Sequence, residues 1–170
     1  TAGLHFDKTL LTSLASMGVK LAKISLKIGM GTFQPIRESI VENHKIHKEL
    51  IEIDKTSIDL IKESKKRNGR VICVGTTSLR CIESVCKKNK GVLKPFKGET
   101  DLYIYPGFQF EIADVLITNF HLPYSSLLVL VSAFAGYKRT MLAYDHAINK
   151  GYRFYSYGDA MLIFPYSNGS

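Results

Sequence analysis

A short apolar strand, a turn of small residues and a helix follow one another directly between residues 70 and 90. The apolar pattern predicts a strand at 70–74 and a helix at 79–90, with glycine, threonine and serine forming a turn at 75–78. This order is typical of an open sheet with helices packed against it. We therefore expect an α/β fold, a mixed α+β sheet with packed helices.

The rest of the chain contains further segments of both kinds. Asp7 and Asp54 each precede a helical pattern and are the expected N-caps. Gly136 is expected to separate two consecutive helices. The predicted strands lie at 23–28, 50–53, 102–105, 115–118 and 152–164, the last interrupted near Gly158, and the further helices lie at 7–18, 54–69, 124–135 and 140–149.

Composition limits the class of protein. With 170 residues, 45% hydrophobic and 22% charged, the chain suits one globular domain with a real core. The apolar run at 127–135 is far shorter than the ~20 residues of a membrane span. Three scattered cysteines without a secretory signal indicate reduced thiols and a cytoplasmic protein. Because the chain opens at Thr1 and not at methionine, we expect a piece of a longer protein.

The formal net charge is +8, which favours a polyanionic partner such as nucleic acid. Basic residues cluster near the expected ends of two helices, where cations also complement the helix dipole. A solvated face is thus the alternative interpretation of Lys65, Lys66 and Arg67, our candidate RNA contacts on the first of these helices.

Polar residues gather at the ends of predicted elements between residues 98 and 136, where α/β proteins usually build sites. Glu99 and Asp101 flank Thr100; in an extended segment they point to opposite sides, so a two-carboxylate dyad is not implied. Asn119 and His121 follow the next strand. Helix capping can explain Asn119, but it explains His121 less easily.

The segment 74–80 (VGTTSLR) places backbone N–H groups and hydroxyls at a helix N-terminus, which suits a carboxylate or a phosphate. Arg80 can reinforce such a site. The segment lacks the lysine and glycine spacing of a Walker loop. An ordinary turn, with Thr77 or Ser78 as N-cap, is the alternative.

The segment 42–49 (ENHKIHKE) holds His44 and His47, which share a face if the segment is helical. The HExxH spacing of a zinc site is absent. General acid–base chemistry and a surface role both remain open for these histidines.

The segment 152–163 (YRFYSYGDAMLI) is rich in aromatic residues. Its rings can stack on nucleic-acid bases while Arg153 contacts phosphate. Such a stripe is also common where a strand is half core and half surface.

Seven segments occur in an order that resembles one family, the S-adenosylmethionine:tRNA ribosyltransferase-isomerases (QueA family). They are TAGLHF, IGMGTFQPI, ENHKIHKE, RVICVGTTSLR, GETDLYIYPGFQF, ITNFHLPYSSLLVLVSAFAG and YRFYSYGDAMLI. Family members are roughly twice this length, beyond one typical domain. The resemblance implies that residues 1–166 are the C-terminal part of the catalytic domain, that 167–170 are a frayed tail, and that an inserted β-barrel-type domain is absent.

The resemblance also implies a reaction in queuosine biosynthesis. The enzyme transfers and isomerises the ribosyl moiety of S-adenosylmethionine onto 7-aminomethyl-7-deazaguanine at the tRNA wobble position. Epoxyqueuosine forms, and adenine and methionine are released. S-adenosylmethionine is a consumed substrate, so no cofactor and no metal are expected, and the protein is taken as a monomer that acts away from membranes.

This chemistry needs a base near the sulfonium and a proton for the departing adenine. The candidate acid–base residues are His44, His47, Glu99, Asp101 and His121, with His5 as a further polar group in a matching motif. The candidate substrate-binding residues are Gly75, Thr76, Thr77, Ser78, Arg80 and Asn119. The candidate RNA-binding residues are Tyr152, Arg153, Lys65, Lys66 and Arg67.

Three alternatives compete with this interpretation. A methyltransferase would have a glycine-rich turn after its first strand and an acidic residue ending the second, and neither is clear here. A non-catalytic RNA-binding module is the second alternative. An inactive fragment of the ribosyltransferase is the third.

Overall fold

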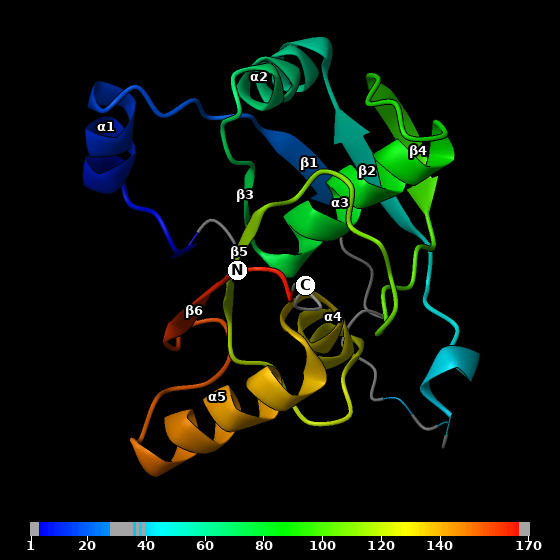
Figure 1. Ribbon diagram of the computed structural model, residues 1–170, viewed down its shortest axis with the longest axis vertical. Coiled ribbons are helices and arrows are strands. Elements are labelled where there is room, and N and C mark those ends of the chain that lie inside the picture. Colours follow the sequence, from blue (N-terminus) through cyan, green and yellow to red (C-terminus); the bar gives the residue numbers. More distant parts are fainter. Residues whose placement is uncertain (1–3, 28–35, 37, 39, 167–170) are drawn as a thin grey trace.

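The computed structural model describes residues 4–27, 36, 38 and 40–166. Figure 1 shows the arrangement of the elements. In chain order these are α1 (Lys8–Ser16), β1 (Ile24–Lys27), the 3-10 helix η3 (Val41–Asn43), β2 (Glu49–Ile53), α2 (Lys55–Lys66), β3 (Ile72–Val74), α3 (Thr76–Lys88), β4 (Phe96–Thr100), β5 (Val115–Asn119), α4 (Ser126–Ala135), α5 (Tyr137–Asn149) and β6 (Ala160–Ile163).

The described strands form two small sheets. The first has the order β1-β2-β4 and is antiparallel throughout. The second has the order β3-β5-β6, in which β3 and β5 run parallel and β6 is antiparallel to β5. The expected mixed α/β class is confirmed, with the strands divided between two sheets.

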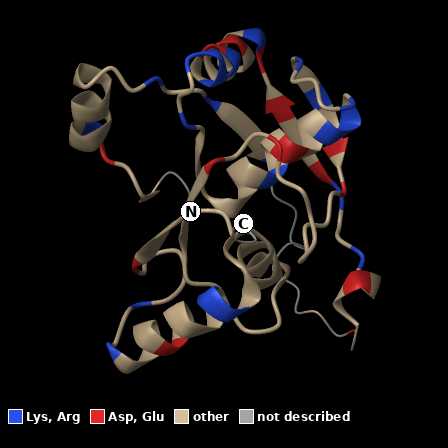
Figure 2. Cartoon of the chain, viewed as in Figure 1, with Lys and Arg blue, Asp and Glu red and all other residues tan. Residues whose placement is uncertain are grey.

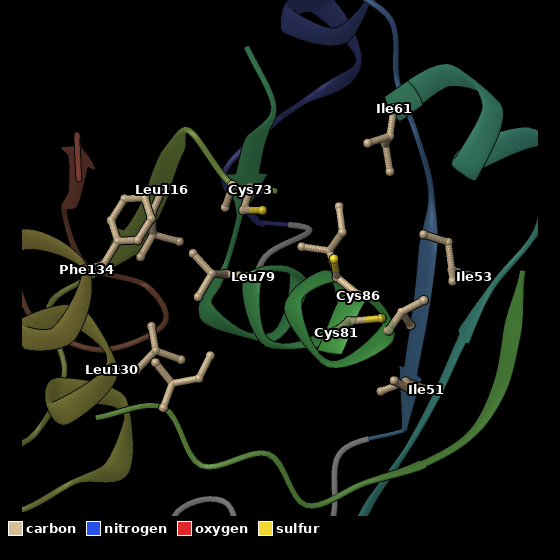
Figure 3. Packing of buried hydrophobic residues seen from close by; sticks show 14 of the residues in the cluster. Ile51, Ile53, Ile61, Cys73, Leu79, Cys81, Cys86, Leu116, Leu130 and Phe134 are labelled. Carbon is tan, nitrogen blue, oxygen red and sulfur yellow. The ribbon is translucent and has the colours of Figure 1, made fainter. Parts of the chain in front are cut away.

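Helix α3 lies between the two sheets and is the centre of the core. It contacts β1 and β4 of the first sheet and β3 and β5 of the second. Figure 3 shows its buried side chains between Ile51 and Ile53 on one side and Leu116 and Phe134 on the other. Because α3 is covered on both sides, even its polar residues Glu83 and Ser84 are buried.

Local signals predicted several boundaries correctly. The Asp7 side chain accepts a hydrogen bond from Leu10 N (2.7 Å) and Asp54 accepts one from Ser57 N (2.7 Å), so both are N-caps. Gly136 separates α4 from α5 as expected. The strand predicted at 23–28 is confirmed as β1, apart from residue 28, which lies outside the described residues, as does the tail 167–170.

One predicted strand is absent and another is shorter than predicted. Residues 102–105 form no strand, because the Thr100 hydroxyl accepts the Leu102 N–H (3.2 Å) and turns the chain after β4. The condition under which His44 and His47 would share a helix face is not met, because η3 ends at Asn43 and residues 44–48 lead without helix into β2. The strand expected at 152–164 is reduced to β6, because residues 153–159 close into a loop.

Helix α1 has the predicted apolar face but buries none of its residues. Leu10 is 40% exposed and Met17 is 77% exposed. In Figure 1 this helix stands apart from the core. Within the described residues, none of the helices combines the length and apolar character needed to cross a bilayer.

Candidate functional site

The parallel strands β3 and β5 end at the same edge of their sheet. Val74 is in register with Ile117, and the Gly75 N–H donates to the Ile117 carbonyl (2.7 Å). The turn into α3 and the turn after β5 therefore begin side by side. This is the position at which open α/β sheets bind ligands.

The first turn differs from the prediction in where its helix begins. Gly75, and neither Thr77 nor Ser78, is the N-cap, and α3 already starts at Thr76. Gly75 has φ 85° and ψ 144°, a backbone conformation that is almost exclusive to glycine, and it provides no side-chain cap. A helix leaves its first N–H groups without partners of its own, so this end of α3 suits an anion.

Asn119, the last residue of β5, carries a buried acceptor at the end of this strand. Its side-chain NH₂ donates to the carbonyls of Gly158 (3.2 Å) and Asp159 (3.1 Å), which fixes the orientation of the amide. The residue is only 2% exposed, and its Oδ1 has no hydrogen-bond partner among the described residues. An unsatisfied buried acceptor is costly, so Oδ1 suits a ligand that donates an N–H.

His121 lies in the turn after β5 and is held at two points. Its Nε2 is 3.0 Å from the hydroxyl of Thr118, and its backbone N–H donates to the Tyr144 hydroxyl (2.8 Å). Burial lowers the pKa of His121 to about 4, so the imidazole is neutral at pH 7. A neutral imidazole can accept a proton or a hydrogen bond at this edge.

His44 and His47 lie elsewhere, after η3 and before β2 of the other sheet. His44 Nδ1 is 3.1 Å from Glu38 Oε2, and its ring packs edge-on against Tyr103 with centroids 5.5 Å apart. His47 is exposed. Among the part of the chain that the structure describes, no group of three or more metal-ligating side chains comes together.

Glu99 and Asp101 are also separate from His121. Glu99 is in β4 and forms an exposed ion pair with Lys48 (3.2 Å), while Asp101 is exposed just beyond the strand. The five predicted acid–base residues therefore divide between the two sheets. Their catalytic roles stay predictions.

Arg80 is directed away from bulk solvent into a buried ion pair with Glu49 of β2. Their side chains are only 5% and 0% exposed, and burial lowers the pKa of Arg80 to about 10. Beside this pair, the Ser84 hydroxyl lies 2.7 Å from that of Thr100. The guanidinium thus links α3 to the first sheet, and its predicted role in substrate binding stays a prediction.

The predicted RNA contacts lie in two places. Lys65 is bound to Asp114 (2.8 Å) and Arg67 to Glu63 (2.5 Å), while Lys66 is exposed. Tyr152 and Arg153 instead follow α5. Figure 2 shows basic residues both on α2 and on α5 with the loop that follows it, at opposite ends of the molecule.

Two tyrosines near the predicted residues were not expected. Tyr103 packs on His44, and its hydroxyl is buried without a hydrogen-bond partner among the described residues. Tyr144 on α5 anchors the His121 backbone. The helical spacing of the buried Thr140, Tyr144 and Ala147 indicates a core-facing position for Tyr144, but it does not reveal the hydrogen bond.

Comparison with known proteins gives consistent results. The family model described as a queuosine biosynthesis protein matches residues 1–163. The crystal structure of S-adenosylmethionine tRNA ribosyltransferase from Thermotoga maritima is similar, with a TM-score of 0.79 and 38% sequence identity over 96% of this chain. The present chain covers 51% of that protein, about half its length. The chain therefore belongs to the queuosine biosynthesis protein family.

Proposed function

We propose that this chain is part of an S-adenosylmethionine:tRNA ribosyltransferase-isomerase that modifies tRNA in queuosine biosynthesis. The 38% identity to the Thermotoga maritima ribosyltransferase over 96% of the chain carries this proposal. The substrates are S-adenosylmethionine and a tRNA with 7-aminomethyl-7-deazaguanine at the wobble position. The products are epoxyqueuosine in the tRNA, adenine and methionine.

The edge formed by β3 and β5 is the proposed site for the methionine end of S-adenosylmethionine. The N-terminus of α3 offers N–H groups and a positive dipole end for the carboxylate. The buried Asn119 Oδ1 offers an acceptor for the ammonium. The helix N-terminus thus supplies hydrogen-bond donors for the carboxylate of the amino acid, and Asn119 supplies an acceptor for its ammonium group.

His121 is the proposed proton carrier of this site. The sulfonium acidifies its neighbouring C–H, and the neutral imidazole accepts that proton with the Thr118 hydroxyl holding the ring. The pKa of His121, lowered by burial to about 4, keeps the imidazole neutral at pH 7; it makes the ring a weak base toward the C–H but a ready donor once it is protonated. It therefore passes the proton readily to the departing adenine, and His121 returns to its neutral form.

The test is product analysis by mass spectrometry. The reaction contains the chain, S-adenosylmethionine and an anticodon stem-loop carrying 7-aminomethyl-7-deazaguanine. Release of adenine and methionine with a mass gain on the RNA supports ribosyl transfer. Formation of S-adenosylhomocysteine would instead indicate methyl transfer and would contradict the proposal.

Because the chain covers half of the compared enzyme, the same assay is repeated with the upstream half of a ribosyltransferase added in trans. Turnover only after this addition supports the proposal and locates essential residues in both halves. Absence of turnover in both assays, with S-adenosylmethionine binding also absent, would favour a non-catalytic RNA-binding fragment.

A further inference from the structure

The loop between α5 and β6, residues 153–159, is closed by a dense set of short-range hydrogen bonds. Asp159 accepts from the Arg153 backbone N–H (2.8 Å) and from its guanidinium (3.1 Å), and the Asp159 N–H donates to the Arg153 carbonyl (2.8 Å). Inside this ring, the Gly158 N–H donates to the Tyr155 carbonyl (3.0 Å). The two ends of the loop are thus fixed to one another.

The same loop is attached to the candidate site. The Tyr155 N–H donates to the Phe120 carbonyl (3.1 Å), and the Asn119 amide holds the carbonyls of Gly158 and Asp159. Phe154 points inward, and the centroid of its ring lies 5.1 Å from the centroid of the Phe120 ring. The position of the loop is therefore set by the residues that directly precede His121.

The backbone of the loop is also strained. Tyr155 has φ 67°, which is unusual for a bulky residue. A Cβ at Gly158 would lie 2.3 Å from the Arg153 carbonyl oxygen, so no other residue fits there without a shift of the backbone. Strain of this kind persists only where surrounding contacts enforce it, and it concentrates at functional sites.

The closed loop exposes two aromatic rings. Tyr155 is 58% exposed and Tyr157 is 86% exposed, whereas Phe154 and Tyr152 pack against the ring of Phe120. Exposed aromatic rings on a loop whose backbone is held by hydrogen bonds, in a chain of net charge +8, are suited to stacking on the bases of a single-stranded polyanion.

We propose that Tyr155 and Tyr157 stack on unpaired RNA bases, and that these bases flank the nucleotide presented to the site at His121. The inference rests on the proposed function for the identity of the RNA, an anticodon loop. It assigns base stacking to the two exposed tyrosines, while Tyr152 supports the aromatic cluster beneath them. Arg153, held by Asp159, closes the loop.

The test measures binding of an unmodified anticodon stem-loop with 2-aminopurine beside the wobble position. Tyr155→Ala and Tyr157→Ala are each expected to weaken binding by about 5- to 150-fold, the range for loss of one stacked base. They are also expected to reduce the quenching of 2-aminopurine that stacking causes. Tyr155→Phe and Tyr157→Phe keep a ring and are expected to bind within about twofold of the parent chain.

Tyr137→Ala is the matched control, because Tyr137 is 65% exposed at the other end of α5. It is expected to leave both signals unchanged, and circular dichroism checks that every variant is folded. Unchanged affinity and quenching in both alanine variants of the loop would overturn the inference. That result would not touch the proposed function, which the release of adenine and methionine tests separately.

Discussion

Gly75 occupies a backbone conformation, φ 85° and ψ 144°, that side chains disfavour. We predict that Gly75→Ala lowers the free energy of unfolding by about 1–3 kcal/mol. Because the substitution also disturbs the N-terminus of α3, we expect the affinity for S-adenosylmethionine to fall about tenfold or more, the equivalent of ~1.4 kcal/mol. Urea unfolding and calorimetric titration measure the two quantities.

Gly18 provides the control for that experiment. It also has a positive φ, 81°, and no atom would lie within 4 Å of an added Cβ. Gly18→Ala is therefore expected to cost stability through backbone strain without changing affinity. Equal loss of binding in both variants would argue against a ligand at the start of α3.

His121 makes the stability of the chain depend on pH. Its pKa is about 4 in the folded state against 6.5 for the free side chain, so the unfolded state binds more protons between these values. The contribution of the neutral ring is fully present above pH 6.5 and is lost as the pH falls toward 4. We expect the free energy of unfolding to drop by about 2 kcal/mol between pH 7.5 and pH 5 from this residue.

The comparison for this prediction is His121→Gln, which cannot titrate in that range. Urea unfolding of both proteins at the two pH values isolates the contribution of the imidazole. If the parent chain and the variant lose the same stability, the ring is not held neutral by burial.

The buried pair of Arg80 and Glu49 connects helix α3 to strand β2 of the first sheet. Removing one member leaves an uncompensated buried charge, so Arg80→Leu is expected to cost about 3–5 kcal/mol of stability. Replacing both residues by leucine removes both charges and is expected to cost less than the single substitution. Urea unfolding of the two single variants and the double variant gives the coupling energy.

Additive losses in that cycle would contradict a direct interaction between the two side chains. Ser84→Ala serves as a control within the same helix, because it removes a hydroxyl next to Thr100 and leaves both charges in place. The Ser84 hydroxyl makes two buried hydrogen bonds, to the Arg80 carbonyl (2.6 Å) and with Thr100, so the substitution is expected to cost about 1–3 kcal/mol.

Local signals in the sequence were sufficient for many elements of this fold. The caps Asp7 and Asp54 act on residues three positions away, so their patterns predict helix starts directly. The failed strand at 102–105 shows the limit of the same approach. Its apolar residues fit a strand, but the Thr100 hydroxyl turns the backbone and only Ile104 is deeply buried.

The candidate site was predicted in part for a related reason. Glycine and small polar residues marked the edge at Gly75 and Asn119, because strand ends and helix starts have recognisable sequences. The partner of Arg80 is Glu49 in β2, which lies far from it in the sequence. No local pattern specifies such a partner. The sequence therefore predicted that Arg80 binds substrate and did not predict the ion pair.

The whole molecule carries a net charge of +8, which predicts RNA binding that depends on salt. If single-stranded RNA loses three phosphate counterions on binding, the slope of log K against log salt is about −2, or roughly 20-fold between 50 and 200 mM. Lys66→Ala/Arg67→Ala removes two charges from the end of α2. We expect a shallower slope for this variant if α2 contacts phosphate, as predicted from the sequence.

The matched control is Lys88→Ala/Lys97→Ala, which removes the same charge from the end of α3 and from β4. Each double variant also removes one cation of an exposed ion pair, Arg67 with Glu63 or Lys97 with Glu52. If log K depends equally on log salt in both variants, the basic residues of α2 contribute only to the net charge of the protein and make no specific phosphate contact. That outcome would direct the search for phosphate contacts to other basic residues, first those on α5 and the loop 153–159, where the unpaired bases are proposed to stack.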